Sequence, residues 1–323
     1  MKRSIMTVIA VIVLIFVVVG VASAAESKKP EKIRFAYQTA HTLFVVANEL
    51  GWFQEEFSKD GIAFEAKVFV AGPPIIEAFA GGRLDFGLVG DQPALLARAN
   101  GIDIKAVGVP LSGYKNLALV VPAGSKITGV SDLKGKRVGV TVGSVGQHLL
   151  YLFLKKNGLK PSDIKQFNLQ PPDIKLALSL NHIDAAVTWD PWISIIEEEK
   201  IGRPILDGSG LKNNANVIIV AEQFAKDYPD VIKRVLKIFL RAEEFVENNP
   251  EKAIAISAKA TGYKREVQAR AFRKFDYDIR LTDDVVKSIE QTALFLRESN
   301  LLRKDVNVKD LVDTRYLKSI GAQ

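Results

Sequence analysis

The sequence contains a duplicated pattern about one hundred positions apart. Residues 70–74 align with residues 169–173, and at the same offset of 99 positions residues 83–91 align with residues 182–190. Each copy reads as a Pro-rich turn, a short helix, a tight turn with Asp, an apolar strand and a second Asp. Because such self-similarity marks a repeated structural unit, we expect the chain to fold as two related halves.

Each copy is preceded by a similar opening. Residues 33–37 form a β-rich run, and a helical segment around residues 44–50 follows and stops at Gly51. Residues 137–141 form the same kind of run, and their helix, around residues 147–156, stops at Asn157-Gly158. Each half therefore has the predicted element order β-α-β-α-β, which predicts an α/β fold with parallel strands and helices on both sheet faces. The expected architecture is two lobes joined by a two-strand hinge, with a ligand cleft between them.

Two apolar runs mark the expected passages between the lobes. Residues 117–122 follow Ser112-Gly113 and are expected to be the first crossing, and residues 217–220 the return crossing. The predicted domains are thus lobe I, residues 31–113 and 216–323, and lobe II, residues 114–215. Beyond the return the pattern is helical: Pro229 opens one helix that ends at residues 248–250, and Thr282 is the predicted N-cap of another. We expect these C-terminal helices to pack on lobe I.

The first 24 residues have the features of a secretory signal peptide. Lys2 and Arg3 precede an apolar run, and Ala22-Ser23-Ala24 supplies the small residues of a cleavage site. We expect cleavage after Ala24; the run is also nearly long enough to be an uncleaved membrane anchor. The chain has no cysteine, which excludes a lipid-modified N-terminus, disulfides and thiol catalysis. The expected location is the periplasm, free or held by the N-terminal segment.

Charge and composition favour an ordinary globular protein. The formal net charge is +7, with 48% hydrophobic and 25% charged residues. Lys and Arg form no stripe along the chain, so no nucleic-acid partner is expected. We expect a monomer.

The candidate ligand site follows from the predicted topology. Ligands of open α/β sheets bind beyond the carboxyl ends of the strands, which selects the loops after each predicted strand. From lobe I these loops supply Gln38, His41, Thr42, Gly90 and Asp91, and from lobe II they supply Gly143, Ser144, Val145, His148, Trp189 and Asp190.

The loop at residues 143–148 is the most informative of these. Its glycines and Ser144 stand where a helix begins, so free main-chain N–H groups and the positive end of the helix dipole meet there. That arrangement suits an anion, although Ser144 could simply cap the helix. The spacing matches neither a Rossmann fingerprint nor a P-loop. Since these loops lack Arg and Lys, a singly charged, weakly hydrated anion fits them better than phosphate.

Several candidates have a structural interpretation as well. Asp91 and Asp190 could act as acid and base, but capping of the helices that follow them is favoured. His41 and His148 could donate to an anion or serve only the local structure, and their spacing is not that of a metal site. Trp189, at a strand end, is a candidate aromatic wall of the cleft. No catalytic motif is recognisable, so we expect a binding protein rather than an enzyme, with no metal or cofactor.

Residues 31–323 resemble the periplasmic substrate-binding proteins of ABC importers for aliphatic sulfonates, taurine and nitrate. The similarity lies, in order, in residues 36–38, 71–73, 84–91, 132–138, 143–144, 169–173 and 189–191. It implies a type II periplasmic-binding fold, hinge closure over a small anion, and delivery to an ABC permease with its ATPase.

The alkanesulfonate-binding branch is the most similar, which implies a sulfonate as the solute. Nitrate, pyrimidines and aromatic acids remain open as alternatives. Two other functions also remain: a membrane-tethered sensor domain with a separate signalling partner, and an enzyme on the same scaffold. The pyrimidine synthases that resemble this fold carry a cysteine-rich motif, which is missing here.

Overall fold

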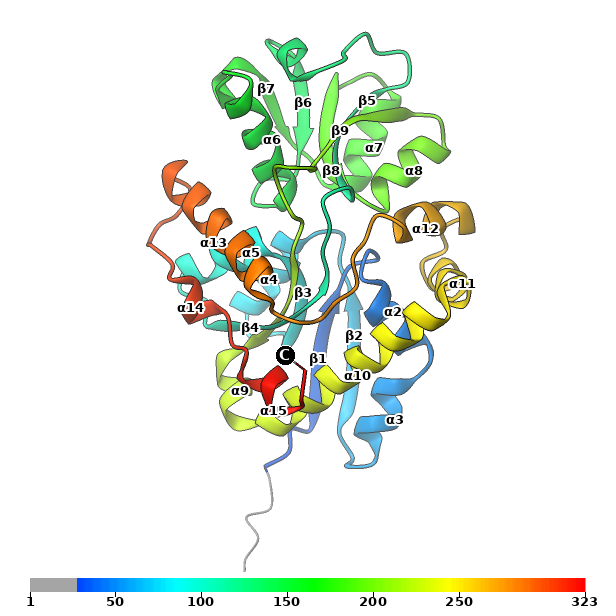
Figure 1. Ribbon diagram of the computed structural model, residues 1–323, viewed down its shortest axis with the longest axis vertical. Helices are drawn as coiled ribbons and strands as arrows, with labels where there is room; N and C mark the ends of the chain where they lie inside the picture. Colours follow the sequence, from blue (N-terminus) through cyan, green and yellow to red (C-terminus); the bar gives the residue numbers. More distant parts are fainter. Residues whose placement is uncertain (1–27, 323) are drawn as a thin grey trace, which may run out of the picture.

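The computed structural model describes residues 28–322 and shows two α/β lobes stacked one on the other (Figure 1). The sheet of the first lobe has the order β2-β1-β3-β10-β4, with β1 Lys32–Tyr37, β2 Ala63–Val68, β3 Phe86–Gly90, β4 Ile104–Leu111 and β10 Asn216–Ala221. The sheet of the second has the order β7-β6-β8-β5-β9, with β5 Leu117–Pro122, β6 Arg137–Val140, β7 Lys165–Asn168, β8 Ala185–Trp189 and β9 Gly202–Asp207. The predicted two-lobed α/β fold is confirmed.

Both sheets have the same topology. Strands β1, β2 and β3 are parallel, as are β6, β7 and β8. In each sheet the strand that follows a passage between the lobes, β10 or β5, inserts antiparallel beside the parallel set. The duplication in the sequence is thus a duplication of the fold.

Helices cover both faces of each sheet. The first lobe has α2 Thr42–Glu49, α3 Trp52–Ser58, α4 Gly72–Ala80 and α5 Asp91–Ala99, and the second has α6 Val145–Lys156, α7 Pro171–Ser179 and α8 Trp192–Glu198, with 3-10 turns at Val130–Leu133 and Pro161–Asp163. The C-terminal helices are α9 Glu222–Asp227, α10 Pro229–Asn248, α11 Pro250–Thr261, α12 Arg265–Phe272, α13 Asp283–Glu298, α14 Val308–Leu311 and α15 Arg315–Ser319. The expected N-cap is present, because the Thr282 side chain accepts from the N–H of Val285.

The apolar runs expected to be the crossings are instead strands within the sheets. Residues 117–122 form β5 and residues 217–220 lie in β10, each fully buried between strands of its own sheet apart from the strand ends. The chain passes between the lobes just before each strand, at residues 112–116 and 208–215. A continuous run of apolar residues is typical of a strand buried in the middle of a sheet, where its main-chain groups are hydrogen-bonded on both sides, and this explains the difference.

The C-terminal helices pack on both lobes, so the expectation that they pack on lobe I is correct only in part. Helices α10 and α11 pack on α2, and α13 packs on α5, but α12 packs on α8 of the second lobe. Between α12 and α13 the chain runs beside the first crossing, where Ser112 and Asp276 exchange two main-chain hydrogen bonds of 3.0 Å. Three segments therefore meet at the hinge.

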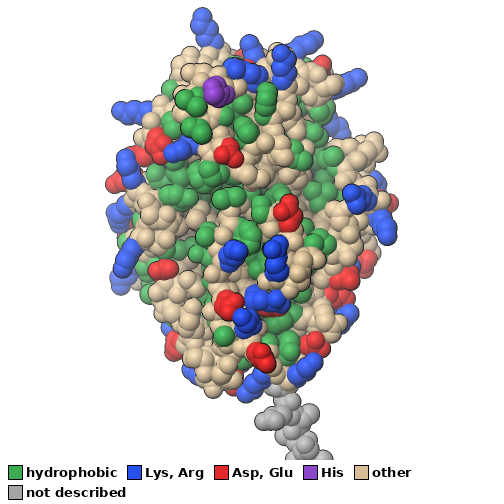
Figure 2. Space-filling view, turned by 180° about the vertical axis from the view of Figure 1, so that it is seen from behind, with side chains coloured by type: hydrophobic (Ala, Val, Ile, Leu, Met, Phe, Trp, Pro, Cys, Tyr) green, Lys and Arg blue, Asp and Glu red, His purple; other side chains and the backbone are tan. Residues whose placement is uncertain are grey.

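The predicted signal peptide, residues 1–24, lies outside the described residues. Among the helices of residues 28–322, none has the length and apolarity needed to cross a bilayer. Lys and Arg are interspersed with Asp and Glu on the face in Figure 2, without a basic stripe there.

In each lobe a matching Arg–Asp pair connects the N-terminal ends of two neighbouring strands. Asp85 accepts from the main-chain N–H of Arg34 at 2.8 Å and from its guanidinium at 2.6 and 3.0 Å. Asp184 accepts from Arg137 in the same way, at 2.8, 2.8 and 3.1 Å. The Asp residues that the sequence placed in turns before strands thus tie those strands to their neighbours.

We predict that Asp85→Ala lowers the free energy of unfolding by about 2 kcal/mol, because the main-chain N–H and the guanidinium group of Arg34 both lose their hydrogen-bond acceptor. Asp184→Ala should cost less, roughly 1 kcal/mol, since its side chain is 29% exposed against 7% for Asp85. Urea denaturation measures both. Asp103→Ala, which removes an exposed ion pair with Arg98, is the control; equal losses in all three variants would contradict the argument.

Candidate functional site

A small cavity lies where the two lobes meet, at the carboxyl ends of β1, β3, β6 and β8. Its volume is about 20 Å³, close to that of a single water site. Both lobes and the second crossing line it, through Gln38, Gly72, Gly90, Pro93, Ser144, Val145, Trp189, Asn214 and Asn216. None of these residues is charged, so polar contacts in the cavity come from amides, a hydroxyl and the main chain.

Three helices begin at the cavity wall. Helix α4 starts at Gly72, α5 follows its N-cap Gly90, and α6 starts at Val145. Their positive dipole ends therefore face the cavity from both lobes. Ser144 is the N-cap of α6, accepting from Gly146 N at 3.1 Å and donating to Thr141 O at 2.6 Å. The capping interpretation of Ser144 is thus correct, and the same cap holds the α6 terminus against the cavity.

Five of the eleven candidate residues line the cavity: Gln38, Gly90, Ser144, Val145 and Trp189. Six lie behind it or beside it: His41, Thr42, Asp91, Gly143, His148 and Asp190. Four lining residues were not among the candidates: Gly72, Pro93, Asn214 and Asn216. The signal for the asparagines was present, since Asn213, Asn214 and Asn216 stand together in front of an apolar strand.

His41 and Thr42 support the wall from inside lobe I. The His41 ring lies between Gln38, at 3.2 Å, and the side chain of Asn216, also at 3.2 Å. Burial lowers the pKa of His41 to about 4, against the opposing effect of its hydrogen bonds to Asn216 and Gln38, so the ring is neutral. Thr42 accepts from the Tyr277 hydroxyl at 3.0 Å.

Asp91 and Asp190 occupy equivalent positions in the two lobes and make equivalent contacts. Each accepts from an N–H of the helix that follows: Asp91 from Gln92 at 2.8 Å and Asp190 from Ser194 at 3.0 Å. The N-caps of α5 and α8 are Gly90 and Pro191, so both aspartates bond to N–H groups in the first turn without being the N-caps that were favoured for them. Both are also fully buried and paired with a lysine.

The lysine partners come from the hinge. Lys212 of the second crossing is 3% exposed and pairs with Asp91, while Lys274 lies 3.0 Å from Asp190. Burial raises the pKa of Asp190, and Lys274 opposes that rise. Because each carboxylate is turned to a lysine away from the cavity, neither lines it as an acid or a base.

The lobes touch each other around the cavity. A Cβ placed on Gly90 would come within 2.5 Å of Val145 Cγ1, and Gln92 donates to Gln147 at 3.3 Å across the interface. His148 stacks on Phe295 of α13 with ring centroids 3.9 Å apart. Burial, followed by the charge of Lys212, lowers the pKa of His148 well below its usual range. His148 is thus a neutral contact between α6 and a C-terminal helix.

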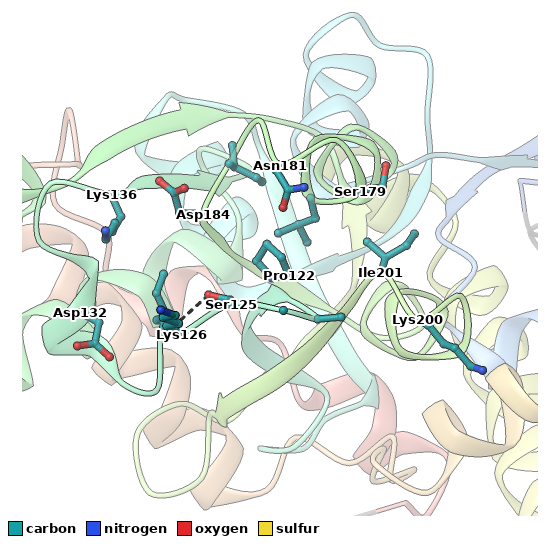
Figure 3. Close-up of a pocket in the computed structure, with 15 residues that line it drawn as sticks. Pro122, Ser125, Lys126, Asp132, Lys136, Ser179, Asn181, Asp184, Lys200 and Ile201 are labelled. Carbon is teal, nitrogen blue, oxygen red and sulfur yellow. Dashed lines mark hydrogen bonds between the residues drawn. The ribbon is translucent and has the colours of Figure 1, made fainter.

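A larger hollow, of about 950 Å³, lies at the opposite strand ends of lobe II (Figure 3). Four of its charged lining residues, Lys126, Asp132, Lys136 and Asp184, lie on one side of it in the close-up, and Lys200 lies on the other. Ligand sites of such sheets lie at the carboxyl ends of the parallel strands, and this hollow is at the other end. The cavity between the lobes is therefore the better candidate.

We predict that His41 makes the protein less stable in acid. Its pKa falls from 6.5 in the unfolded chain to about 4 in the folded one, so the unfolded state binds the extra proton first as pH falls. Stability should decrease between about pH 6.5 and 4, by about 3 kcal/mol in total. Urea denaturation of the wild type and His41→Gln across this range measures it. Carboxylates contribute to both proteins, so the difference between the two isolates His41; parallel curves would contradict the prediction.

Known proteins are similar to this chain in sequence. A family model described as NMT1/THI5 like matches residues 38–253. A protein of Bacillus subtilis (strain 168), named as an aliphatic sulfonates-binding protein, is 30% identical over 321 residues, covering 98% of this chain and 96% of that protein. A protein of the same name from Escherichia coli (strain K12) is 31% identical over 293 residues, covering 90% and 91%.

A solved structure agrees with these relatives. The alkanesulfonate-binding protein SsuA from Xanthomonas axonopodis pv. citri, bound to MOPS, superposes with a TM-score of 0.83 at 28% identity, covering 89% of this chain and 99% of that one. The two lobes and their hinge are the type II periplasmic-binding fold that the resemblance implied. Since the family model spans most of both lobes and the relatives span nearly the whole chain, the protein belongs to the NMT1/THI5-like family.

Proposed function

We propose that this protein is the exported solute-binding component of an ABC import system, and that it captures an aliphatic sulfonate and delivers it to a membrane permease and its ATPase. One observation carries the proposal: a cavity between two lobes is lined by neutral donors and helix N-termini, with no charged side chain. The similarity to proteins named for binding sulfonates supports the same solute class.

The chemistry of the cavity suits a sulfonate group. A sulfonate carries one negative charge spread over three oxygens, which amides and helix N-termini can stabilise without a cation. A phosphate dianion usually recruits Arg or Lys, and here the nearby Lys212 and Lys274 are already paired with Asp91 and Asp190. Trp189, Pro93 and Val145 offer apolar surface for the alkyl part of the ligand.

Binding requires the lobes to separate and close. A cavity of about 20 Å³ cannot admit a sulfonate, so the ligand enters an open form. Both lobes contribute wall residues, and closure is stabilised because only the closed form contacts the ligand from both sides. The six candidates that do not line the cavity act as supports: His41, Thr42, Asp91, Gly143, His148 and Asp190.

Binding is favoured over catalysis on the same scaffold. The one hydroxyl among the lining side chains, that of Ser144, is occupied as a helix cap by Gly146 and Thr141. No histidine or carboxylate stands among the lining residues to activate it. We infer a monomeric binding protein that needs no cofactor.

The proposed solute can be tested by thermal denaturation of the chain from Ala25 onward, in a buffer free of sulfonates such as MOPS. A ligand that binds only the folded state raises the melting temperature by mass action. Alkanesulfonates and taurine should raise it, and calorimetry should confirm binding. Sulfate, nitrate, carboxylates and pyrimidines serve as comparisons. Shifts caused only by pyrimidines or aromatic acids would overturn the sulfonate assignment.

Closure can be tested at the closest approach of the lobes. Gly90→Ala should weaken sulfonate binding by about tenfold, because its Cβ would collide with Val145 and hold the lobes apart. Small-angle scattering with saturating ligand should show compaction of the wild type and less compaction of the variant. Gly124→Ala, whose Cβ would meet nothing within 4 Å, is the matched control. Equal compaction of the wild type and Gly90→Ala would contradict the closure model.

A further inference from the structure

A continuous line of side-chain hydrogen bonds connects the cavity wall to both crossings. His41 Nε2 lies 3.2 Å from Asn216 Oδ1, and Asn216 Nδ2 lies 3.1 Å from Asn214 Oδ1. Asn214 Nδ2 in turn lies 2.7 Å from Oδ1 of Asn116, in the first crossing. We call these four residues, His41, Asn216, Asn214 and Asn116, the amide relay; all are buried, between 0% and 8% exposed.

Main-chain carbonyls fix the direction of the relay at its centre. A carbonyl oxygen can only accept, and the main-chain oxygen of Asn214 lies 3.3 Å from one amide atom of Asn216. That atom must therefore be the nitrogen Nδ2. The Asn216 oxygen then faces His41, so His41 Nε2 must carry a hydrogen.

Both ends of the relay agree with this direction. At the hinge end, the nitrogen of Asn116 faces two main-chain oxygens, those of Ser112 at 3.0 Å and Lys274 at 3.4 Å, which turns its Oδ1 towards Asn214. At the cavity end, His41 Nδ1 lies 3.2 Å from both the main-chain nitrogen and the main-chain oxygen of Gln38, and in a neutral ring with its hydrogen on Nε2 it accepts from the N–H. The main-chain oxygen of Gln38 already accepts from the N–H of His41.

The direction of the relay decides what the cavity can offer a ligand. The amide oxygens of Asn216, Asn214 and Asn116 all have donors within the relay. Asn214 Nδ2 has two hydrogens and donates one of them, to Asn116, among the described residues. Asn214 lines the cavity, so the second hydrogen of its Nδ2 is a donor available at this wall.

We propose that His41 is a positioning residue: its Nε2–H donates to Asn216 Oδ1 and so holds the Asn216 and Asn214 amides in an orientation that leaves a hydrogen of Asn214 Nδ2 for the ligand, and Asn116 anchors that orientation at the hinge. The inference rests on the proposed function, in that an anion occupies the cavity. With the opposite tautomer, His41 Nε2 would face Asn216 Oδ1 with no hydrogen between them, and the relay would lose its donor at this end. One buried ring thus makes a neutral site selective for anions.

The tautomer can be measured without any ligand. In a nitrogen–proton NMR correlation spectrum of the histidine rings, His41 should show a hydrogen on Nε2 and none on Nδ1 between pH 7 and pH 5. Assignment uses the spectrum of His41→Gln, from which the signal must disappear. A hydrogen on Nδ1 would overturn the proposal even if the protein binds sulfonates.

Variants test the effect on binding. His41→Leu should weaken alkanesulfonate binding about tenfold, since Asn216 Oδ1 loses its donor, and His41→Gln should recover most of that affinity by donating from a similar position. Asn116→Ala, which does not line the cavity, should weaken binding several-fold through Asn214. Calorimetry measures the affinity, and thermal melting confirms that each variant is folded.

The outcomes separate the relay from the proposed function. If the wild type binds no sulfonate, the proposed function fails, while the tautomer still tests the relay. If the wild type binds, equal affinity losses in folded His41→Gln and His41→Leu would overturn the positioning role. If His41→Leu does not fold, Asn116→Ala decides: wild-type affinity in that variant would refute the coupling through Asn214.

Discussion

Hydrogen bonds between the two crossings fix these segments against each other, and the position of the cavity wall depends on them. Asn214 N donates to Gly113 O at 2.9 Å, and Gly113 N donates to Asn213 Oδ1 at 2.8 Å. Gly113 has a φ of +131°, and a Cβ there would lie 2.7 Å from Asn116 Nδ2 and 2.8 Å from Lys274 O. Only glycine lets the three hinge segments approach this closely. That contact fixes where Asn214 and Asn216 stand in the cavity wall.

Electrostatics at the hinge follow the same duplication as the fold. Asp91 and Asp190 are equivalent in the two repeats, yet their lysine partners come from segments outside the repeats, the second crossing and the chain after α12. A buried ion pair contributes little net stability, because desolvation of both charges offsets their attraction. Here the pairs fix positions instead: Asp91 links the start of α5 to the second crossing, and Asp190 links the start of α8 to the segment after α12. The pairs also keep both lysines from the cavity, so a protein of net charge +7 has an uncharged site.

The sequence predicted the parts of the site that obey local rules. The duplicated pattern and the strand-end rule located Gln38, Gly90, Ser144, Val145 and Trp189, which line the cavity. Asn214 and Asn216 were missed because they lie in an irregular segment whose path depends on tertiary contacts. The partners of the two aspartates were missed for a related reason: Lys212 is 121 positions from Asp91, and no spacing rule connects residues so far apart. His41 was selected as a possible ligand contact, but it stands one layer behind the wall.

Under the proposed function, a cavity lined by neutral donors suits a protein that must release the solute it captures. A lysine in the cavity would bind an anion more strongly, but it would have to lose its hydration at every closure and regain it at every opening. Helix N-termini and amides that are already hydrogen-bonded within the protein carry no such charge, and their orientation is set before the ligand arrives. The buried ring of His41 extends this preorganisation, since its burial lowers its pKa to about 4 and keeps it uncharged at neutral pH. In the proposed function, the free energy of binding is then available to close the lobes rather than to orient the groups that contact the anion.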